Sequence, residues 1–378
     1  TMLGLDALDQ AVVEGKLVGT KQWSEDQTYL LRGLVSVEAG SLLEIEPGTR
    51  ILGERGSALI IGRGAQLRAE GTAEAPIVFT SAQPVGERRA GDWGGVVLLG
   101  RAPVNRFDAR IEGLPERLAR GYGGSDTDHN CGSLRYVRIE FGGYELAPDS
   151  ELNGLTLAGC GRRTLVRNVQ VHRGLDDGVE LFGGNVDLSR VVVTQAQDDG
   201  LDWQQGYVGR IQFLVVQQGR AGGDAAIEAD NLEEKHNAKP RSAPILSNIT
   251  LIGSGDATRD QRGMVLRRGT GGTILNALLI GFPVEAIDIR DIATASLVGD
   301  DGLQFAGLAM HAIGGGRLFE PETGGNDDDG GFSESDYFTG RVPGVNTRDD
   351  PLLPAAALDV AVPEFVPAAG SGWRWPFT

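Results

Sequence analysis

The sequence predicts an all-β protein that folds as a single-domain, right-handed parallel β-helix with a long inserted loop and an irregular C-terminal cap. Three observations support this fold class. A unit of about 22 residues recurs in the middle of the chain, Gly accounts for 57 of the 378 residues, and the repeated runs alternate with period two. The right-handed sense follows from the general rule for parallel crossovers.

Composition and charge exclude several classes of protein. Hydrophobic residues make up 40% of the chain, which is enough to build a core and argues against a disordered acidic tail. The formal net charge is −17. This acidic balance argues against nucleic-acid binding and against docking on anionic lipid, because both need a basic face. No apolar run reaches the roughly 20 residues that span a bilayer, so we expect no transmembrane segment in this chain.

The first third of the chain carries short apolar strands that follow glycine turns. We predict an N-terminal cap over residues 1–30 and the β-helix over 31–313. The segment 101–130 interrupts the strand pattern and is predicted to be a long loop excursion. Strands resume at 134–139 and 154–157.

The repeat is clearest in the middle of the chain, where five copies each contain two short strands separated by Gly, Asn or Asp turns. A coil of this size cannot bury its apolar face alone, so successive coils are expected to stack into long parallel sheets. A polar insertion at 233–240 separates the third copy from the fourth. The five copies occupy 168–181, 190–203, 213–229, 248–266 and 276–289.

The pattern becomes irregular near the C-terminus, and we predict a cap over residues 314–378. A solenoid end exposes unpaired strand edges and therefore needs covering. The tail from Phe332, with Trp373 and Trp375, is predicted to supply that cover.

Six segments carry motifs that occur together in one family of proteins. They are Ile45–Thr49, Gly71–Ser81, the Trp-Gly-Gly motif at 93–95, the Leu-Arg-Tyr-Val-Arg-Ile-Glu-Phe motif at 134–141, Asp176–Glu180 and Ile227–Asn231. Over about residues 30 to 355 the chain resembles a family of bacterial secreted or outer-membrane β-helix proteins, many of them lipoproteins. The resemblance implies the fold and a location outside the cytoplasm: extracellular, periplasmic or on the outer-membrane surface. The family is a distant architectural relative of pectate lyases and polygalacturonases, and its members are mostly uncharacterised, so it implies little about function.

The stacked coils predict a row of acidic side chains. Strand alternation points Glu180 outward, and equivalent positions on neighbouring coils lie about 4.8 Å apart. Asp202 and Glu228 continue this row on the next two coils, and Asp288 follows two coils later.

An open ligand groove is predicted along this acidic row. Its ligand-binding side chains would be Glu180, Asp202 and Glu228, and its edges would be formed by Trp203 and Tyr207. The expected ligand is a carbohydrate.

A calcium site is predicted at the turns just before the acidic row, where Asp176 and Asp177 are expected to stack on Asp198 and Asp199. Neighbouring carboxylates raise one another's pKa, and they are tolerated through hydration, arginine neighbours or a bound cation. Calcium favours carboxylate oxygens, so Asp176 and Asp198 are its predicted ligands. The alternative is turn chemistry, in which Asp before Gly closes a tight corner and outward acids keep a β-surface soluble.

A second calcium hypothesis concerns Asp126, Asp128 and Asn130. Oxygen-bearing residues at alternate positions resemble the opening of a calcium-binding loop. The expected glycine falls one position late, at Gly132, and Val137 stands where a helix-loop-helix site would have its closing acid. The sequence therefore predicts at most a loop calcium site without flanking helices.

The chain has two cysteines, Cys131 and Cys160, which lie 29 residues apart. A zinc site would need further ligands at short spacing, which the four scattered histidines do not supply. Two alternatives remain open, a disulfide or a pair of buried thiols, and the disulfide is the functional prediction.

Catalysis is the less favoured prediction. A polysaccharide lyase or glycoside hydrolase would use Asp177, Asp199, Asp202 and His172 as its acid–base residues. The Gly-His-Gly segment of β-helix glycosidases is absent from the sequence.

The favoured function is therefore that of a non-catalytic envelope or extracellular module, for binding or structure, stabilised by Ca²⁺. Its partner would be a polysaccharide, another envelope protein or a second copy of itself. A self-assembling surface or filament subunit is the remaining alternative.

Overall fold

The computed structural model describes residues 10–116, 118, 121–148, 150–320, 328–347, 350, 351, 353, 357 and 365. The chain is an all-β parallel solenoid with a small helical region near its C-terminus, which confirms the predicted fold class. It contains two compact units. The first runs to Pro103 and includes Asp108–Glu180 and Gly184–Asp187; the second consists of Val104–Phe107, Leu181–Gly183 and the chain from Leu188 onward.

The first unit stacks parallel strands whose apolar residues lie above one another. Tyr29 pairs with Ile51, and Ile51 pairs with Phe79 on the next coil, so each core position receives an apolar neighbour. Its strands are β1 Gln10–Leu17, β2 Thr20–Trp23, β3 Thr28–Val37, β4 Leu42–Ile45, β5 Arg50–Gly53, β6 Ala58–Ile61, β7 Gln66–Glu70, β8 Ile77–Ser81, β9 Val96–Leu99, β10 Gly132–Glu140, β11 Glu145–Ala147, β12 Ser150–Glu151, β13 Leu155–Ala158 and β14 Leu165–His172; β15 Val179–Phe182 is shared between the units.

Parallel strand pairing extends into the segment expected to be the N-terminal cap. Strands β1 and β2 lie inside the region predicted as a cap, and they pair in parallel with β3 and β4. No residue of β1 is buried, so the strand lacks the apolar face that would have revealed it in the sequence.

The excursion 101–130 forms no named strand among its described residues, as expected. Backbone hydrogen bonds tie it back to the coil that it leaves. Gly123 N donates to Gly100 O at 3.0 Å, and Asp126 N donates to Arg101 O at 2.9 Å.

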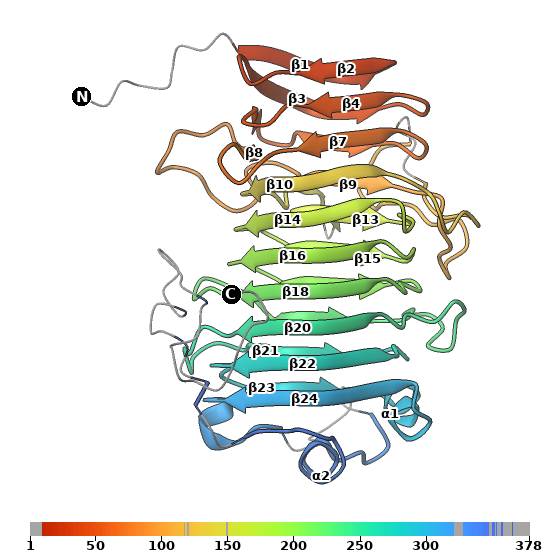
Figure 1. Cartoon of the computed structure of the whole chain (residues 1–378), viewed down its shortest axis with the longest axis vertical. Coiled ribbons are helices and arrows are strands. Elements are labelled where there is room, and N and C mark those ends of the chain that lie inside the picture. Colours follow the sequence, from red (N-terminus) through yellow and green to blue (C-terminus); the bar gives the residue numbers. More distant parts are fainter. Residues whose placement is uncertain are drawn as a thin grey trace. The chain divides into compact units, whose positions relative to one another are not determined.

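The second unit contains the repeats in the predicted register. Val191 pairs with Leu214, Leu214 with Ile249, and Ile249 with Ala277, so the four copies stack where the repeat placed them (Figure 1). A further coil, unrecognised in the sequence, follows with β24. The strands are β16 Asp187–Thr194, β17 Leu201–Gln204, β18 Arg210–Gln217, β19 Ala225–Ala229, β20 Ile245–Ile252, β21 Arg262–Leu266, β22 Gly272–Ile280, β23 Glu285–Ile289 and β24 Leu303–His311.

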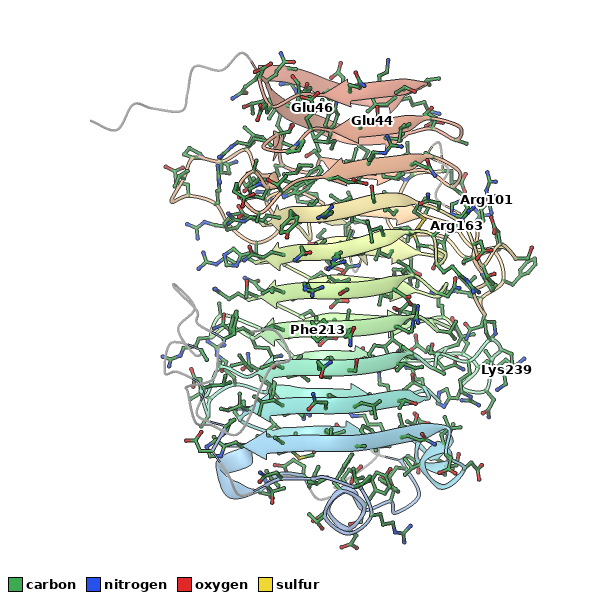
Figure 2. The ribbon with its side chains drawn as sticks, viewed as in Figure 1. Glu44, Glu46, Arg101, Arg163, Phe213 and Lys239 are labelled. Carbon is green, nitrogen blue, oxygen red and sulfur yellow. A yellow bond between two sulfur atoms is a disulfide. The ribbon has the colours of Figure 1, made fainter. Side chains whose placement is uncertain are left out.

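One position in each of these long strands has a left-handed backbone. Arg190, Phe213, Asn248 and Asn276 have φ values of 56, 63, 56 and 55° and occupy the same place on successive coils. Figure 2 labels Phe213 on this face. Asn tolerates this conformation better than most residues, and Asn276 also donates its side-chain amide to Asn248. The bend therefore recurs with the coil, although its residue types vary.

The C-terminal end of the second unit is covered by two helices. Helix α1, Ile292–Gly299, begins after its N-cap residue Asp291, and the 3₁₀ turn η1, Gly314–Gly316, follows β24. Helix α2, Glu334–Gly340, lies beyond β24 (Figure 1). Its Phe338 is fully buried, 4.9 Å from the Phe305 ring and 5.2 Å from the Phe319 ring. The other predicted cap residues, Trp373 and Trp375, lie outside the described part of the chain.

No helix among the described residues is long and apolar enough to cross a membrane.

The aromatic contact of α2 makes a testable prediction. Phe338→Ala should lower the free energy of unfolding by about 3–5 kcal/mol, because it removes a fully buried ring and leaves a cavity. Urea unfolding measures this change. Phe107→Ala is the matched control, since Phe107 is 97% exposed and its loss should change stability by about 0.5 kcal/mol or less. Equal effects of the two substitutions would contradict the packing described.

Candidate functional site

The candidate site is an acidic face on β17 and β19 of the second unit, formed by Asp198, Asp199, Asp202, Asp224 and Glu228. Asp202 lies opposite Glu228 in the parallel register, as the repeat predicted. The row continues through Val265 on β21 to Asp288 on β23.

The turns before these strands bring three carboxylates together. Asp224 N donates to Asp198 O at 3.0 Å, which stacks the two turns. One carboxylate oxygen from each of Asp198, Asp199 and Asp224 lies within 4.8 Å of the other two. These three side chains could together hold a metal ion.

The sequence Asp-Asp-Gly fixes this corner. A Cβ at Gly200 would overlap the side chain of Val216 and the carbonyl oxygen of Ala226, so only Gly fits at the point where the chain enters β17. The carboxylate of Asp199 accepts the N–H of Ala225 at 2.7 Å, and only 4% of its residue surface is exposed.

Burial and like charge both shift the acids of this face. Burial raises the pKa of Asp199 well above its ordinary value, and Glu228, Asp198 and Asp224 raise it further. Burial likewise raises the pKa of Glu228 to about 7, although Arg267 opposes the shift. These acids therefore hold protons at a pH where exposed carboxyl groups are ionised.

Arginines from the turn after β21 neutralise part of the charge. Arg267 binds the carboxylate of Glu228 and donates to Asp230 at 2.9 Å. Arg268 donates to the other oxygen of Asp230 at 2.6 Å and to Glu233 at 3.0 Å. The sequence indicated that arginine neighbours could stabilise stacked acids but did not identify this pair.

A second acid–arginine cluster lies further along the same unit. Arg262 is 3.2 Å from Glu285 and 3.6 Å from Asp288, and Arg290 is 2.8 Å from Asp288. Burial raises the pKa of Glu285 to about 7, and Asp288 adds to the shift. Glu285 was missed in the sequence because it is the first residue of β23, three positions before the predicted row at Asp288.

The structure corrects the prediction of an open groove. Trp203 and Tyr207 are 1% and 0% exposed, so they belong to the interior. Strand alternation explains why Trp203 is buried. Residues two apart on a strand face the same side, so Trp203 faces the core with Leu201, and Asp202 faces the opposite side. Its indole N–H donates to the hydroxyl of Thr270 at 3.0 Å. Of the acids predicted to line the groove on β17 and β19, Asp202 is only 7% exposed and Glu228 is half-buried.

The remaining predicted acids and His172 lie in the first unit. Asp177 and Glu180 are buried, Asp176 is half-buried, and Glu180 accepts the side-chain amide of Asn153 at 2.5 Å. Burial, with a contribution from Arg173, lowers the pKa of His172 to about 4, so its imidazole is neutral at pH 7.

The side chains of the loop Asp126–Asn130 make local contacts. Asp126 accepts the N–H of Asp128 at 3.1 Å, and Asn130 accepts the N–H of Gly132 at 2.8 Å. Asp128 pairs with Arg162 at 3.0 Å. The side-chain oxygens therefore satisfy local turns and an arginine, which is the turn chemistry that competes with metal binding.

Cys131 and Cys160 form a disulfide, with their Cα atoms 5.9 Å apart. The sequence left open a disulfide or two buried thiols, and the structure contains the disulfide. The bridge joins the end of the excursion to the turn before β14.

Comparison with known proteins identifies the family. The model of the pectate-lyase-like β-helix domain matches residues 15–320. The chain belongs to this family. No curated protein and no solved structure matches it significantly. The match confirms the β-helix part of the resemblance noted in the sequence and assigns no activity to the acidic face.

The pKa shifts of this β-helix domain predict how its stability depends on pH. Glu285 takes up its proton at a higher pH when folded, near 7, than its ordinary value of 4.5. The folded state thus binds more protons between these values, and the free energy of unfolding falls as pH rises from about 4.5 to about 7.

Glu285→Gln removes this contribution. The variant should be more stable than the native chain at pH 8 by on the order of 3 kcal/mol, and nearly equal to it at pH 4. Urea unfolding at both pH values tests this. Glu54→Gln is the control. Glu54 is half-buried, and its ion pair with Arg32 lowers the pKa of Glu54, so no gain in stability at pH 8 is expected. A pH-independent difference for Glu285→Gln would contradict the assignment.

Proposed function

We propose that this β-helix domain is a non-catalytic binding or structural module that works outside the cytoplasm and is stabilised by a divalent cation. The observation that carries the proposal is the cluster of Asp198, Asp199 and Asp224, whose oxygens lie within 4.8 Å of one another. A cation would offset the burial and the like-charge repulsion that raise the pKa of Asp199.

The donor set favours calcium over a transition metal. Every side-chain ligand is a carboxylate oxygen, which suits a hard cation with several oxygen ligands. Two of the three residues are exposed and the third is buried, so an ion here would be reachable from solvent and anchored by the corner of β17. Because bound carboxylates must be deprotonated, cation affinity should increase with pH.

The disulfide supports a location outside the cytoplasm. Structural disulfides persist in oxidising compartments and are rare where thiols are kept reduced. Cys131 and Cys160 are both fully buried, so the bridge has a structural place in the excursion rather than an exposed, labile one.

An acid–base enzyme is the second candidate, and the raised pKa of Glu228 favours it. A carboxyl group that is half-protonated near pH 7, beside Asp202 on the adjacent strand, has the properties of a general acid. Screening neutral and acidic polysaccharides for reducing ends or unsaturated products tests this. Turnover that disappears in Glu228→Gln would replace the non-catalytic proposal.

Calcium should raise the melting temperature. At a concentration about 100 times its dissociation constant, it should add about 3–5 °C at pH 8, because it binds the folded state alone. Asp199→Asn should abolish this shift and raise the melting temperature of the calcium-free protein, since the amide keeps the Ala225 hydrogen bond without the charge. Differential scanning calorimetry measures both effects.

The matched control is Asp300→Asn, which changes an exposed carboxylate outside the cluster. It should leave the calcium shift intact. The proposal fails if calcium does not change the melting temperature of the native chain, or if Asp199→Asn keeps the full shift.

A further inference from the structure

A cavity of about 390 Å³ lies in the first unit, and none of its lining residues belongs to the acidic face. Three parts of the chain form it: the glycine turns that precede β4 and β7, the start and end of the excursion, and the turn that precedes β14. The residues that line it are Gly40, Ser41, Leu42, Gly64, Gln66, Arg101, Asp126, Asp128, His129, Asn130 and Arg163.

Two arginines make this cavity a candidate site for an anion. Arg101 and Arg163 both line it, and Figure 2 labels them at the same edge of the first unit. Within the described part of the chain neither guanidinium forms an ion pair or a side-chain hydrogen bond. In a chain with net charge −17, whose arginines elsewhere pair widely with carboxylates, two unpaired guanidiniums in one cavity stand out.

The carboxylates of the cavity are already engaged. Asp128 pairs with Arg162 at 3.0 Å, and Asp126 accepts the N–H of Asp128 at 3.1 Å. Burial and the charge of Arg101 lower the pKa of His129, which is 7% exposed, so its imidazole is neutral. With Asp128 balanced by Arg162, the two free arginines exceed the single remaining carboxylate, and the cavity has a net positive charge.

Covalent and hydrogen bonds hold the backbone around the cavity. The disulfide joins its two sides, and Arg162 N donates to Thr127 O at 3.0 Å beside it. Cys131 N donates to the hydroxyl of Thr164 at 2.9 Å. These contacts fix the backbone on both sides of Arg163.

Gly64 leaves space for the guanidinium of Arg101. Its φ is +94°, and a Cβ there would overlap the guanidinium of Arg101. The hydroxyl of Ser41, which accepts the N–H of Gly19 at 2.9 Å, still has its own proton to donate into the cavity. Two guanidiniums and a hydroxyl are a donor set for an oxyanion, since arginine binds carboxylate, sulfate and phosphate groups through parallel hydrogen bonds.

We propose that this cavity binds an oxyanion group through Arg101 and Arg163. The oxyanion is either a free inorganic anion or the anionic group of a small sugar, because the volume accommodates both. The site is independent of the calcium cluster and of the acidic face, so it extends the function rather than depending on it.

Isothermal titration calorimetry with inorganic phosphate, sulfate, glucose 6-phosphate and glucose tests the proposal. We expect phosphate or sulfate to bind and glucose not to bind. Tighter binding of glucose 6-phosphate than of inorganic phosphate would identify a sugar-borne anion, and equal binding would identify the free ion; both outcomes support the site. Absence of binding by every anion at millimolar concentration would overturn it.

Arg101→Gln and Arg163→Gln should each weaken anion binding at least about tenfold, because each removes a charge-assisted hydrogen-bond donor. Arg167→Gln is the control, since Arg167 is an exposed arginine of β14 in the same unit. Arg163→Lys keeps the positive charge and should retain part of the affinity for the anion. Thermal melts of every variant show whether a loss of binding results from a loss of folding. A similar loss in Arg167→Gln would show that only net charge matters and would contradict the site.

Discussion

The parallel register of the coils is the constraint on which the other features depend. Strands in a sheet lie about 4.8 Å apart, so every side chain meets the side chain at the equivalent place on the next coil. For apolar residues this is favourable, and the row through Leu201, Ile227 and Met264 forms a continuous core. For carboxylates it is costly, because burial and like charge add to each other at Asp199 and Glu228. The acidic face must therefore be neutralised by arginines, protons or a cation.

All three means of neutralisation have a place in the second unit. Arg267 and Arg268 reach the acids from the turn after β21, where the acidic row is interrupted by Val265. Glu228 and Glu285 retain protons up to about pH 7. In the turn cluster, Asp224 pairs with Arg262 at 3.6 Å, and oxygens of Asp198, Asp199 and Asp224 lie close enough to hold a cation as well. The same physics accounts for stability and for the proposed role of calcium, without any catalytic step.

The sequence predicted what depends on the coil period and missed what depends on contacts across many residues. Aligning the second repeat copy with the third was enough to place Asp202 opposite Glu228. The burial of Trp203 depends on Thr270, 67 residues away, and no local pattern reveals that partner. The oxygens of Asp126 and Asn130 had a calcium-like spacing, but they accept the backbone N–H groups of Asp128 and Gly132. Arg101 and Arg163 line one cavity only because the excursion folds back onto the coils, and the repeat pattern carries no information about that fold.

The central claim is that stacking forces the buried acids of the second unit to hold protons or a cation. A difference titration of the folded and urea-unfolded chain, in calcium-free solution, tests it most directly. The account predicts that the folded protein carries more bound protons than the unfolded chain between about pH 5 and pH 7, and that adding calcium near pH 7 releases protons from the folded protein. Superimposable titration curves for the two states, with no proton release on adding calcium, would contradict it.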